Sequence, residues 1–524
     1  MKKICALFIS LWITGIIAGQ EKDVKSFDPK NLNWYNKDLN LDKVIGTSVD
    51  KAYNSILQNR TPKKTVIVAV IDGGVDIYHE DLAGVIWVNQ DEIPANNIDD
   101  DKNGYIDDIN GWNFIGNKDN QNVLFENFEY TRIVKQQNVN DVNYTKAKSL
   151  YDKELQKRQT ENKNIERFEK VYLEAKSIIL KNTGIDVKSK SDLEKVKSND
   201  NRILGAKDFL SKRYSMGFKE EQLTSFKKLN SEYLDYFLNT GFNPRNIVGD
   251  DPANMQDRNY GNNDVKGPRS SHGTSVSGII AGVRNNNIGI NGIARDVKIM
   301  AIRTTPSGDE RDKDVALAIM YAVDNGADII NMSFGKQVSP QKSFVDMAVK
   351  YAEEHKVLLI HAAGNYGFNI DVLETYPSDR YLDGTEPSNW LNVGASDQTL
   401  DKKLPAIFSN YGAKHVDIFA PGVELVTLDS CNSYSMPSGT SVSAPVVTGI
   451  AALVLSYYPQ LTPSEVIQLL MESSYKVTKP KKVLIPDLEV PKRKKTMFKE
   501  LSKCGGIVNA YNALLLAKER YDKQ

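Results

Sequence analysis

Cysteine and histidine are both scarce in this sequence, with three and five residues among 524. A core of the size that this chain can bury does not need disulfides, so a disulfide-held scaffold is not expected. Cys5 lies in an apolar leader, which leaves only Cys431 and Cys504 to pair. The sequence leaves that bond open, because it supplies no distance between the two thiols.

The sequence also lacks an excess of charge of either sign, because its 67 Lys and Arg residues balance its 67 Asp and Glu residues. The whole protein therefore has no field that would draw it to nucleic acid or to an anionic membrane. Internal repeats and low-complexity tracts are not apparent, and 40% hydrophobic with 26% charged residues is typical of a soluble globular protein. We expect a folded monomer without a nucleic-acid partner.

The first residues have the layout of a secretory signal peptide. Lys2 and Lys3 precede an apolar run from Ile4 to about Ala18, which small residues close at Gly19. The run is shorter than the roughly 20 residues that span a bilayer, which disfavours a membrane anchor. We predict a signal peptide over 1–19 and an exported protein, secreted or periplasmic, with no stable membrane insertion after cleavage.

Short apolar runs alternate with amphipathic segments from Thr65 onwards. The runs are "TVIVAVID", "VKIMAIR", "ADIINMSFG", "KVLLIHAAGN", "NWLNVGAS" and "HVDIFAPG". Unalternated Val, Ile and Leu indicate strands that are buried on both faces, and 315–324 and 344–354 have helical spacing. The expected fold is α/β, a doubly wound, mainly parallel sheet with helices on both faces, over 61–524 after an N-terminal extension at 20–60.

Two stretches break this rhythm. Residues 117–262 are rich in Lys, Glu and Asn, and apolar residues recur every three or four positions at Ile165, Phe168, Tyr172, Ala175 and Ile179. We expect a helical insertion with one apolar stripe; its charges form either a solvated face, which we favour, or a binding surface. The second stretch, from Lys479, reads "KPKKVLIPDLEVPKRKKTMFKEL" and is a basic loop or hairpin broken by proline.

Asp72 and His272 are the first candidates for chemistry. Asp72 ends a buried strand before two glycines, where a carboxylate can orient a histidine, although a strand-terminal Asp alone is more often a turn residue. His272 lies in "SSHGTSVSGIIAG" at the start of a predicted helix, among small residues that leave room for a substrate. We interpret His361 as a core residue, and the remaining histidines as surface residues: His79, His355 and His415.

A third candidate is Ser441 in "SGTSVSAPVVTG". A helix that starts near Ser441 aims free N–H groups and its positive dipole end at this hydroxyl, which favours an alkoxide. Ser438 and Thr440 suit turn and capping roles, and Ser443 points along the helix. Asn365 ends another buried strand in "HAAGNYG"; it is either a turn residue or a side-chain amide donor to an oxyanion.

The order of these residues is informative. Asp, then His, then Ser is the order found in subtilisin, whereas chymotrypsin runs His, Asp, Ser and α/β-hydrolases run Ser, acid, His. The motifs "VIDGGVD", "HGTSVSG", "AAGN" and "GTSVSAP" over 65–450 resemble those of the subtilases, the subtilisin-like serine endopeptidases, and "GGIVNAYNALL" resembles the close of that domain. The chain is identified as a member of that family.

The resemblance implies a role for each matching residue. Asp72 would be the orienting acid, His272 the general base, Ser441 the nucleophile and Asn365 the oxyanion donor. It further implies a substrate-binding edge at Ser333, Phe334 and Gly335, with Gly364 lining the primary specificity pocket. Protein or peptide substrates are therefore expected.

Three positions depart from the family pattern. Gly73 stands where the family usually has Ser or Thr, Ser275 stands in place of the more usual second His, and Val442 with Ser443 replaces small apolar or Met residues. None of these changes removes a catalytic group, so we expect activity.

The stretch "NIDDDKNGYIDDINGWNF" predicts a calcium site. Its residues with side-chain oxygens recur as in the opening of the D-x-[DN]-x-[DN]-G calcium loop. Asn110 stands where that loop has its twelfth-position Glu, so Asp107 or Asp108 must supply the last carboxylate ligand. The predicted ligands are Asp99, Asp101, Asn103, Tyr105 through its carbonyl, Asp107 and Asp108. The alternative is an acidic, hydrated turn, but crowded carboxylates repel one another without a cation.

The prediction is thus a secreted, calcium-stabilised serine endopeptidase. The main alternative is a weak or inactive subtilase-fold binding protein that uses the helical insertion. An esterase is disfavoured, because "GTSVSAP" lacks the G-x-S-x-G elbow.

Overall fold

The structure is a computed structural model that describes residues 23–522. The predicted signal peptide, residues 1–19, lies outside the described residues. The chain divides into two compact units: unit 1 is residues 1–129 with 244–524, and unit 2 is residues 130–243. Unit 2 thus falls within the range 117–262 that we expected for the insertion.

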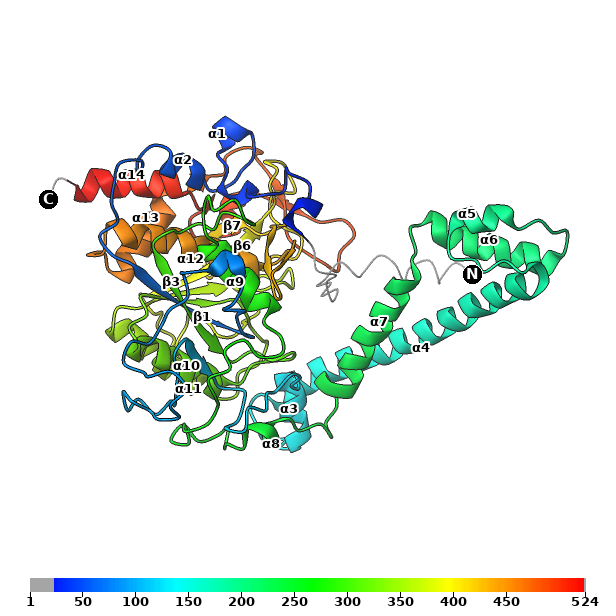
Figure 1. Ribbon diagram of the computed structural model, residues 1–524, viewed down its shortest axis with the longest axis horizontal. Helices are drawn as coiled ribbons and strands as arrows, with labels where there is room; N and C mark the ends of the chain where they lie inside the picture. The colour runs from blue at the N-terminus through cyan, green and yellow to red at the C-terminus, as the bar shows by residue number, and fades with distance from the viewer. Residues whose placement is uncertain (1–22, 523–524) are drawn as a thin grey trace. The chain divides into compact units, whose positions relative to one another are not determined.

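A nine-stranded sheet forms the centre of unit 1 (Figure 1), with the strand order β10-β13-β7-β6-β5-β4-β1-β3-β2. Its pairs are parallel except for β10 with β13. The strands of this sheet are β1 (Val66–Asp72), β2 (Gly111–Asn113), β3 (Val297–Arg303), β4 (Ile329–Met332), β5 (Leu358–Ala362), β6 (Trp390–Ser396), β7 (Ile418–Pro421), β10 (Tyr475–Lys476) and β13 (Gly506–Ile507). Two small antiparallel pairs join β8 (Thr427–Asp429) to β9 (Ser433–Ser435) and β11 (Val483–Leu484) to β12 (Lys495–Thr496).

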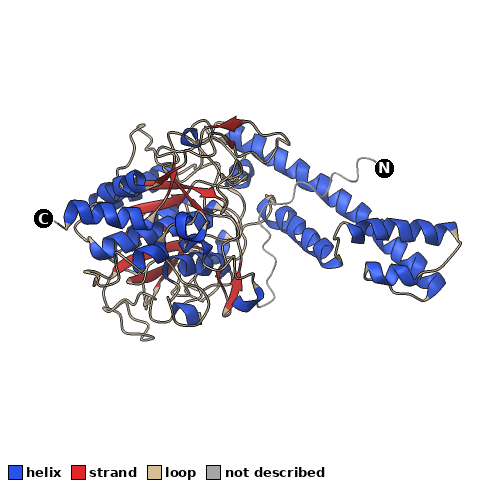
Figure 2. Cartoon of the chain, turned by 90° about the horizontal axis from the view of Figure 1, so that it is seen from above, coloured by secondary structure: helices blue, strands red, loops and turns tan. Residues whose placement is uncertain are grey.

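Both faces of the sheet are buried, as the unalternated apolar runs predicted. Along β1, Val66, Val68 and Val70 belong to one apolar cluster, which includes residues of α9 (Ser271–Ala281) and α12 (Thr440–Tyr457). The intervening Ala69 and Ile71 belong to a second cluster with residues of α10 (Asp312–Asp324) and α11 (Lys342–Glu354). Helices therefore cover both faces (Figure 2), and the predicted doubly wound α/β fold is confirmed.

The helices of unit 1 are mostly short. They are α1 (Leu39–Asp42), α2 (Val49–Tyr53), α8 (Arg245–Val248), α9 (Ser271–Ala281), α10 (Asp312–Asp324), α11 (Lys342–Glu354), α12 (Thr440–Tyr457), α13 (Pro463–Ser473) and α14 (Ala510–Tyr521), with 3-10 turns at Val24–Ser26, Trp34–Asn36, Glu80–Leu82 and Phe498–Glu500. Among residues 23–522, α12 alone has the length and apolar composition of a membrane span, and 89% of that stretch is buried inside the protein.

Unit 2 is helical and has a core of its own. Its helices are α3 (Glu129–Gln136), α4 (Tyr144–Thr183), α5 (Lys190–Lys195), α6 (Asn201–Ser215) and α7 (Glu220–Glu232), followed by a π-helical turn at Tyr233–Phe237. The predicted apolar stripe of α4 lies in this core with residues of α6 and α7. The 40-residue α4 ends at Gly184, which adopts the left-handed conformation that favours glycine at helix ends.

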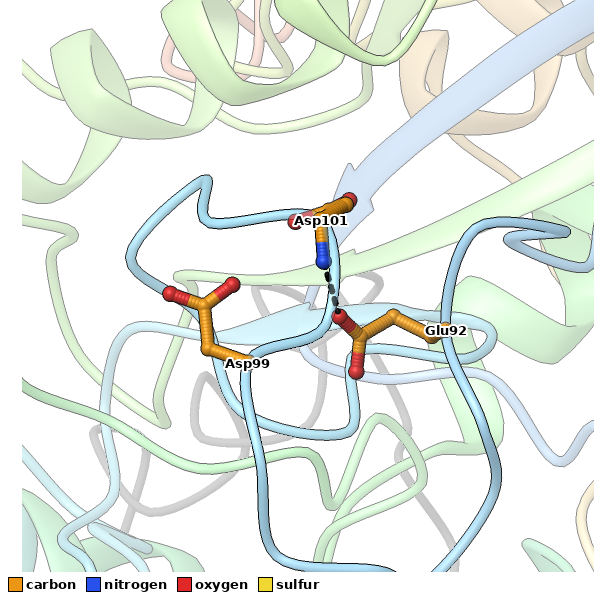
Figure 3. Close-up of side chains that lie close together, drawn as sticks. All are labelled: Glu92, Asp99 and Asp101. Atoms are coloured by element: carbon orange, nitrogen blue, oxygen red, sulfur yellow. Dashed lines mark hydrogen bonds between the residues drawn. The ribbon is translucent and has the colours of Figure 1, made fainter.

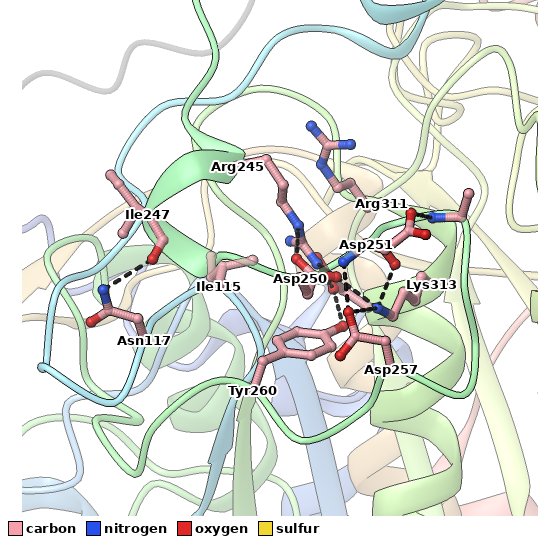
Figure 4. A network of polar contacts seen from close by, with 12 residues as sticks. Ile115, Asn117, Arg245, Ile247, Asp250, Asp251, Asp257, Tyr260, Arg311 and Lys313 are labelled. Carbon is pink, nitrogen blue, oxygen red and sulfur yellow. Dashed lines mark hydrogen bonds and ion pairs between the residues drawn. The ribbon is translucent and has the colours of Figure 1, made fainter.

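A buried ionic network holds the start of α10 in unit 1 (Figure 4). The Nη1 and Nη2 atoms of Arg245 lie 2.7 and 2.8 Å from the two carboxylate oxygens of Asp314. Asp250 accepts hydrogen bonds from Arg245 Nη2 at 2.6 Å and from Lys313 Nζ at 2.7 Å, and the Tyr260 hydroxyl donates to Asp314 at 2.5 Å. The first turn of α10 is thus fixed by charge pairs that are removed from water.

The two cysteines of the described chain are free thiols. Cys431 is exposed, and Cys504 is half-buried. The possible disulfide between them does not form in this structure.

Candidate active site and acidic loop

The strand order of the central sheet reverses at β1. The strands that follow β1 in the central sheet lie on opposite sides of it, with β3 on one side and β4 on the other. Parallel α/β sheets bind ligands at such a reversal of strand order. Asp72 ends β1 at this edge, and the segments after β4 and β5 leave the sheet at the same edge.

Asp72 and His272 are in direct contact. Both carboxylate oxygens of Asp72 lie 2.9 Å from Nδ1 of His272, the second residue of α9. The Asp72 side chain is 3% exposed and the imidazole is 43% exposed, so the carboxylate supports the ring from the protein side. A Cβ at Gly273 would lie 2.1 Å from the carbonyl oxygen of Gly74, so glycine is required for this approach of α9 to β1.

Two opposing effects set the pKa of His272. Burial lowers the pKa of His272, because it disfavours the charged imidazolium, and the positive charge of Arg269 lowers it further. The negative charge of Asp72 and its hydrogen bond raise this pKa, because they stabilise the imidazolium. The partner carboxylate outweighs the other effects, so that the pKa of His272 is raised above 6.5.

Ser441 and Asn365 border one small space at the start of α12. A Cβ built on Gly439 would lie 3.0 Å from Ser441 Oγ and 3.4 Å from Asn365 Nδ2. The backbone N–H and the hydroxyl of Thr440 both donate to Asn365 Oδ1, at 2.8 and 2.9 Å. Because Oδ1 accepts these bonds, the NH₂ group of Asn365 is the part of the amide that borders the same space as the Ser441 hydroxyl.

The four hydroxyls of "SGTSVSAP" differ in their partners. Ser438 Oγ accepts from the Glu424 N–H at 2.8 Å, Thr440 Oγ1 accepts from the Gly364 N–H at 3.0 Å, and Ser443 Oγ donates to the Ala420 carbonyl at 3.2 Å. Ser441 Oγ makes no hydrogen bond to any described residue, so the structure does not join it to His272. Such bonds are often loose without substrate and tighten when it binds.

Two departures from the family pattern have structural reasons. A Cβ at Gly73 would lie 2.9 Å from the carbonyl oxygen of Thr305 and 3.3 Å from that of Arg269, so a side chain there would crowd the backbone. Ser275 donates to the Leu428 carbonyl at 2.6 Å, and Thr427 Oγ1 donates to the Ser275 carbonyl at 2.7 Å. Ser275 therefore ties α9 to β8.

The segment after β4 leaves backbone groups available. Gly335 is exposed, and its peptide N–H and C=O are not hydrogen-bonded to any described residue. Lys336 pairs with Tyr376 through two 2.8 Å bonds, which fixes the segment just beyond Gly335. Gly364 has a φ of +105°, and a Cβ there would lie 2.5 Å from Asn410 Nδ2, so this turn requires glycine.

His361 is buried, as its place in an apolar run predicted, and it supports the same segment. Its Nε2 lies 2.9 Å from the Phe334 carbonyl oxygen, and its Nδ1 lies 2.9 Å from Asn392 Oδ1. Burial lowers the pKa of His361 to about 4, against the effect of these two acceptors. The Phe334 carbonyl therefore points into the protein toward β5 and β6.

The surface prediction is wrong for two other histidines. His79 is 1% exposed, and its Nδ1 accepts the Asp81 N–H at 3.1 Å; burial lowers its pKa. His415 is 7% exposed and lies 3.0 Å from Asp379. Polar neighbours in sequence suggested exposure, whereas His79 bonds a buried neighbour, Asp81, and His415 bonds the distant, buried Asp379. His355 is exposed, as predicted.

The acidic loop gathers three carboxylates. Glu92, Asp99 and Asp101 each place an oxygen within 4.8 Å of the other two (Figure 3). Sequence reasoning missed Glu92, because it precedes the repeating pattern by seven residues. Burial identifies it: Glu92 is 5% exposed, and its oxygens accept the amides of Asp100 and Asp107 at 2.8 and 3.0 Å.

The other predicted ligands have different positions. Asp107 accepts the amide N–H groups of Asn96 and Asn97 at 3.2 and 2.9 Å, and so lies outside the group of three. Asn103 Nδ2 donates to both Asp101 and Asp108, at 3.0 and 3.1 Å. The Tyr105 ring packs against aromatic rings, namely Trp112, Phe114 and Tyr321.

The donor set of this loop fits a hard cation. Its carboxylates form no ion pair with a Lys or Arg of the described residues. Burial raises the pKa of Asp108. The hydrogen bonds that Asp108 accepts from Tyr321, Asn89 and Asn103 act against this rise. Calcium prefers clustered carboxylate and carbonyl oxygens of this kind.

Comparison with known proteins agrees with the motif order. The model described as "Subtilase family" matches residues 63–496. "Thermophilic serine proteinase" of Bacillus sp. (strain AK1) is 39% identical over 188 residues, which are 36% of this chain and 43% of that protein. "Thermitase" of Thermoactinomyces vulgaris is 37% identical over 188 residues, which are 36% of this chain and 62% of that protein.

Coverage of these relatives is partial. Three matches cover 43%, 52% and 46% of the relatives, so the chain spans about half the length of the curated relatives it matches. One similar solved structure, "Proteases from Pseudoalteromonas arctica PAMC 21717", is 25% identical with a TM-score of 0.39 and covers 49% of this chain and 78% of that one. Because the family model spans well over half of the sequence, the chain belongs to the subtilase family.

Proposed function

We propose that the protein is a serine endopeptidase. The observation that carries the proposal is the Asp72–His272 contact at 2.9 Å. Ser441 Oγ and the Asn365 amide, which border one space at the start of α12, support it. Acid, base, nucleophile and oxyanion donor come from four separate segments at one end of the sheet. Family membership supports the same assignment.

In the proposed mechanism, Ser441 Oγ attacks the carbonyl carbon of a peptide bond, and His272 Nε2 takes the hydroxyl proton. Asp72 keeps the proton of Nδ1 in place and stabilises the imidazolium. The amine leaves with the proton from Nε2, and an acyl-enzyme on Ser441 remains. Water then attacks this ester with His272 as base, which releases the acid and restores the serine.

The oxyanion of each tetrahedral intermediate would be bound by Asn365 Nδ2 and by the Ser441 N–H. The dipole of α12 adds to this stabilisation, because Ser441 is the second residue of an 18-residue helix.

Replacement of Asn365 with alanine tests the proposed donor. We expect Asn365→Ala to lower kcat by about 10²- to 10³-fold with a small change in KM, because the donor acts on charge that develops only in the transition state. Steady-state hydrolysis of a fluorogenic peptide measures both constants. Asn369→Ala, four residues further on, is the matched control and should stay near wild type; an unchanged kcat for Asn365→Ala would remove Asn365 from this role.

The substrate would bind as an extended strand along Ser333–Gly335. The unbonded peptide groups of Gly335 offer the hydrogen bonds for strand addition, and the inward Phe334 carbonyl, held by His361, leaves its neighbours to face the substrate. Gly364 would line the pocket for the residue before the cleaved bond. Protein and peptide substrates are the proposed partners.

Incubation with a peptide library tests this function. Purified protein and its Ser441→Ala variant are compared with and without calcium, and cleavage sites are read by mass spectrometry. We expect cleavage by the wild type alone. Equal cleavage by both proteins would exclude the mechanism.

We further propose that the acidic loop holds a structural Ca²⁺ ion. Glu92, Asp99 and Asp101 would hold it, with Asp108 beside them through the shared donor Asn103. The ion would neutralise the crowded carboxylates and so stabilise the fold of the loop, while the peptidase chemistry stays with side chains of the protein.

Chelation should lower the thermal stability of the protein. A ligand present at a thousandfold excess over its Kd stabilises a fold by about 4 kcal/mol, so we expect chelator to lower Tm by roughly 5–10 °C. Differential scanning calorimetry with and without added calcium measures the shift. Glu92→Gln should reduce the calcium-dependent shift, whereas the adjacent exposed Asp91→Asn should keep it; a Tm that does not respond to chelator would contradict the proposal.

The proposed site of action is outside the cytoplasm, either extracellular or periplasmic. The charged and apolar layout of residues 1–19 supports export. Detection of a mature chain that begins after Gly19 would test it; retention of Met1 in exported protein would contradict cleavage.

A further inference from the structure

The basic stretch at the C-terminal side of unit 1 folds as a hairpin, which we call the basic hairpin, residues 479–499. Its two strands pair Val483 with Thr496 and Leu484 with Lys495. The Ile485 N–H continues the pairing to the Lys494 carbonyl at 2.9 Å. The hairpin therefore has a defined backbone that can hold its charges in fixed positions.

The basic hairpin carries an unneutralised positive charge. It has eight basic residues against two acidic ones, Asp487 and Glu489. The rest of the chain then carries 59 Lys and Arg against 65 Asp and Glu (67 − 8 and 67 − 2), so the hairpin is positive on a negative background. No basic side chain of the hairpin pairs with an acidic group among residues 23–522, and seven of the eight are exposed: Lys479, Lys481, Lys482, Lys492, Lys494, Lys495 and Lys499.

The tip of the basic hairpin lies against the segment that carries Asn365. A Cβ at Gly367, two residues after Asn365, would lie 3.1 Å from the Cα of Asp487, so the two backbones are in contact. At its base, the Leu484 N–H donates to the Lys402 carbonyl at 2.7 Å, which brings the exposed Lys402 and Lys403 beside the same hairpin. The basic hairpin thus contacts, through the backbone of Asp487, the segment that carries the proposed oxyanion donor.

Arg493 holds an unused donor beneath this surface. Its Nη1 atom is shielded from solvent and hydrogen-bonded to no described residue. Burial lowers the pKa of Arg493, and only the charge of Asp487 opposes the shift. A guanidinium nitrogen that is removed from water without an acceptor favours a carboxylate ligand.

We propose that the basic hairpin binds acidic segments of protein substrates and so directs them to the proposed active site. This inference rests on the proposed peptidase function and names the substrate class of that site. An acidic peptide chain fits better than a nucleic acid or a lipid surface, because the hairpin touches the segment of Asn365, where a polypeptide would be cleaved. Charges around a site of binding act mainly through the rate of encounter and through KM.

Two peptides with one shared cleavage site test the proposal. One carries a flanking tract of Glu, and the other carries Gln at the same positions. We expect the wild type to cleave the Glu peptide with a kcat/KM about tenfold higher in low salt, chiefly through KM, and to lose the difference at about 0.5 M NaCl as the charges are screened. The preference should disappear in a variant with Lys481→Gln, Lys482→Gln, Lys492→Gln and Lys494→Gln.

The same variant should cleave the Gln peptide at the wild-type rate, which shows that it is folded and active. The matched control removes four exposed, unpaired lysines from unit 2, with Lys181→Gln, Lys190→Gln, Lys197→Gln and Lys228→Gln, and should keep the preference. Equal cleavage of both peptides by the wild type, or a preference that survives in the hairpin variant, would overturn the proposal.

Two further outcomes separate the possible failures. If the wild type cleaves neither peptide and Ser441 resists a fluorophosphonate, the proposed function itself fails. The inference is also wrong if the wild type cleaves both peptides equally but binds vesicles of anionic phospholipid or single-stranded DNA, and the hairpin variant loses that binding. The basic hairpin would then serve a different partner.

Discussion

Asp72→Asn is expected to lower kcat about 10⁴-fold while the protein stays folded. Asp72 is buried, and its Oδ1 also accepts the Gly73 N–H at 2.6 Å. Asparagine has the same shape, but its NH₂ group would face one of the two positions where His272 Nδ1–H now donates. The ring would then turn its Nδ1 lone pair to the amide and carry its proton on Nε2, where it cannot accept the Ser441 proton.

Circular dichroism and steady-state kinetics separate this effect from unfolding. The expected result is a native spectrum with a nearly unchanged KM and a strongly reduced kcat. A kcat within tenfold of wild type would show that Asp72 does not set the tautomer of His272.

The pH dependence of kcat/KM follows from the same contact. His272 acts as a base only when neutral, and Asp72 raises its pKa above 6.5, so activity should rise with pH through a midpoint above that value. Loss of the carboxylate removes the effect that raises the pKa, so the midpoint should move to lower pH in Asp72→Asn. A midpoint that stays in place would show that another group controls this limb.

Asp314→Ala is expected to have the largest effect on stability. It leaves Arg245, which is 6% exposed, without two hydrogen bonds of 2.7 and 2.8 Å, and the Tyr260 hydroxyl loses its acceptor. A buried ion pair that loses one partner costs about 3–5 kcal/mol, mainly because the remaining charge stays buried. Arg245 keeps its 2.6 Å bond to Asp250, so we expect a loss at the lower end, about 3 kcal/mol. Urea unfolding at neutral pH should show this loss in the free energy of unfolding.

Asp324→Ala is the matched control on the same helix. Asp324 is exposed and accepts one bond from Tyr351 at 2.6 Å, so its loss should cost less than about 1 kcal/mol. Joint replacement with Arg245→Met and Asp314→Leu should restore much of the stability, since no unpaired charge remains. Equal losses for Asp314→Ala and Asp324→Ala would contradict the role given to burial.

The sheet could be predicted because its strands read as continuous apolar runs. Val66 to Ile71 face two apolar cores in alternation, so both faces of β1 need apolar residues. Candidate site residues followed from their positions at strand ends and helix starts, where Asp72 and Ser441 stand. Local sequence also predicted the apolar stripe of α4, because helical spacing repeats over several turns.

Residues that depend on distant partners could not be predicted. Glu92 joins Asp99 and Asp101 only because the loop folds back on itself, and no spacing rule connects them. His415 is buried by Asp379, 36 residues away, and its local sequence looks exposed. The support of Phe334 by His361 likewise depends on the pairing of β4 with β5.

Labelling with a fluorophosphonate, followed by mass spectrometric mapping of the modified residue, tests the central claim most directly. The account predicts that the wild type is labelled at Ser441 alone, that Ser441→Ala is not labelled, and that Asp72→Asn is labelled far more slowly. Folded protein that stays unlabelled, or a label on another residue such as Ser438 or Ser443, would contradict it.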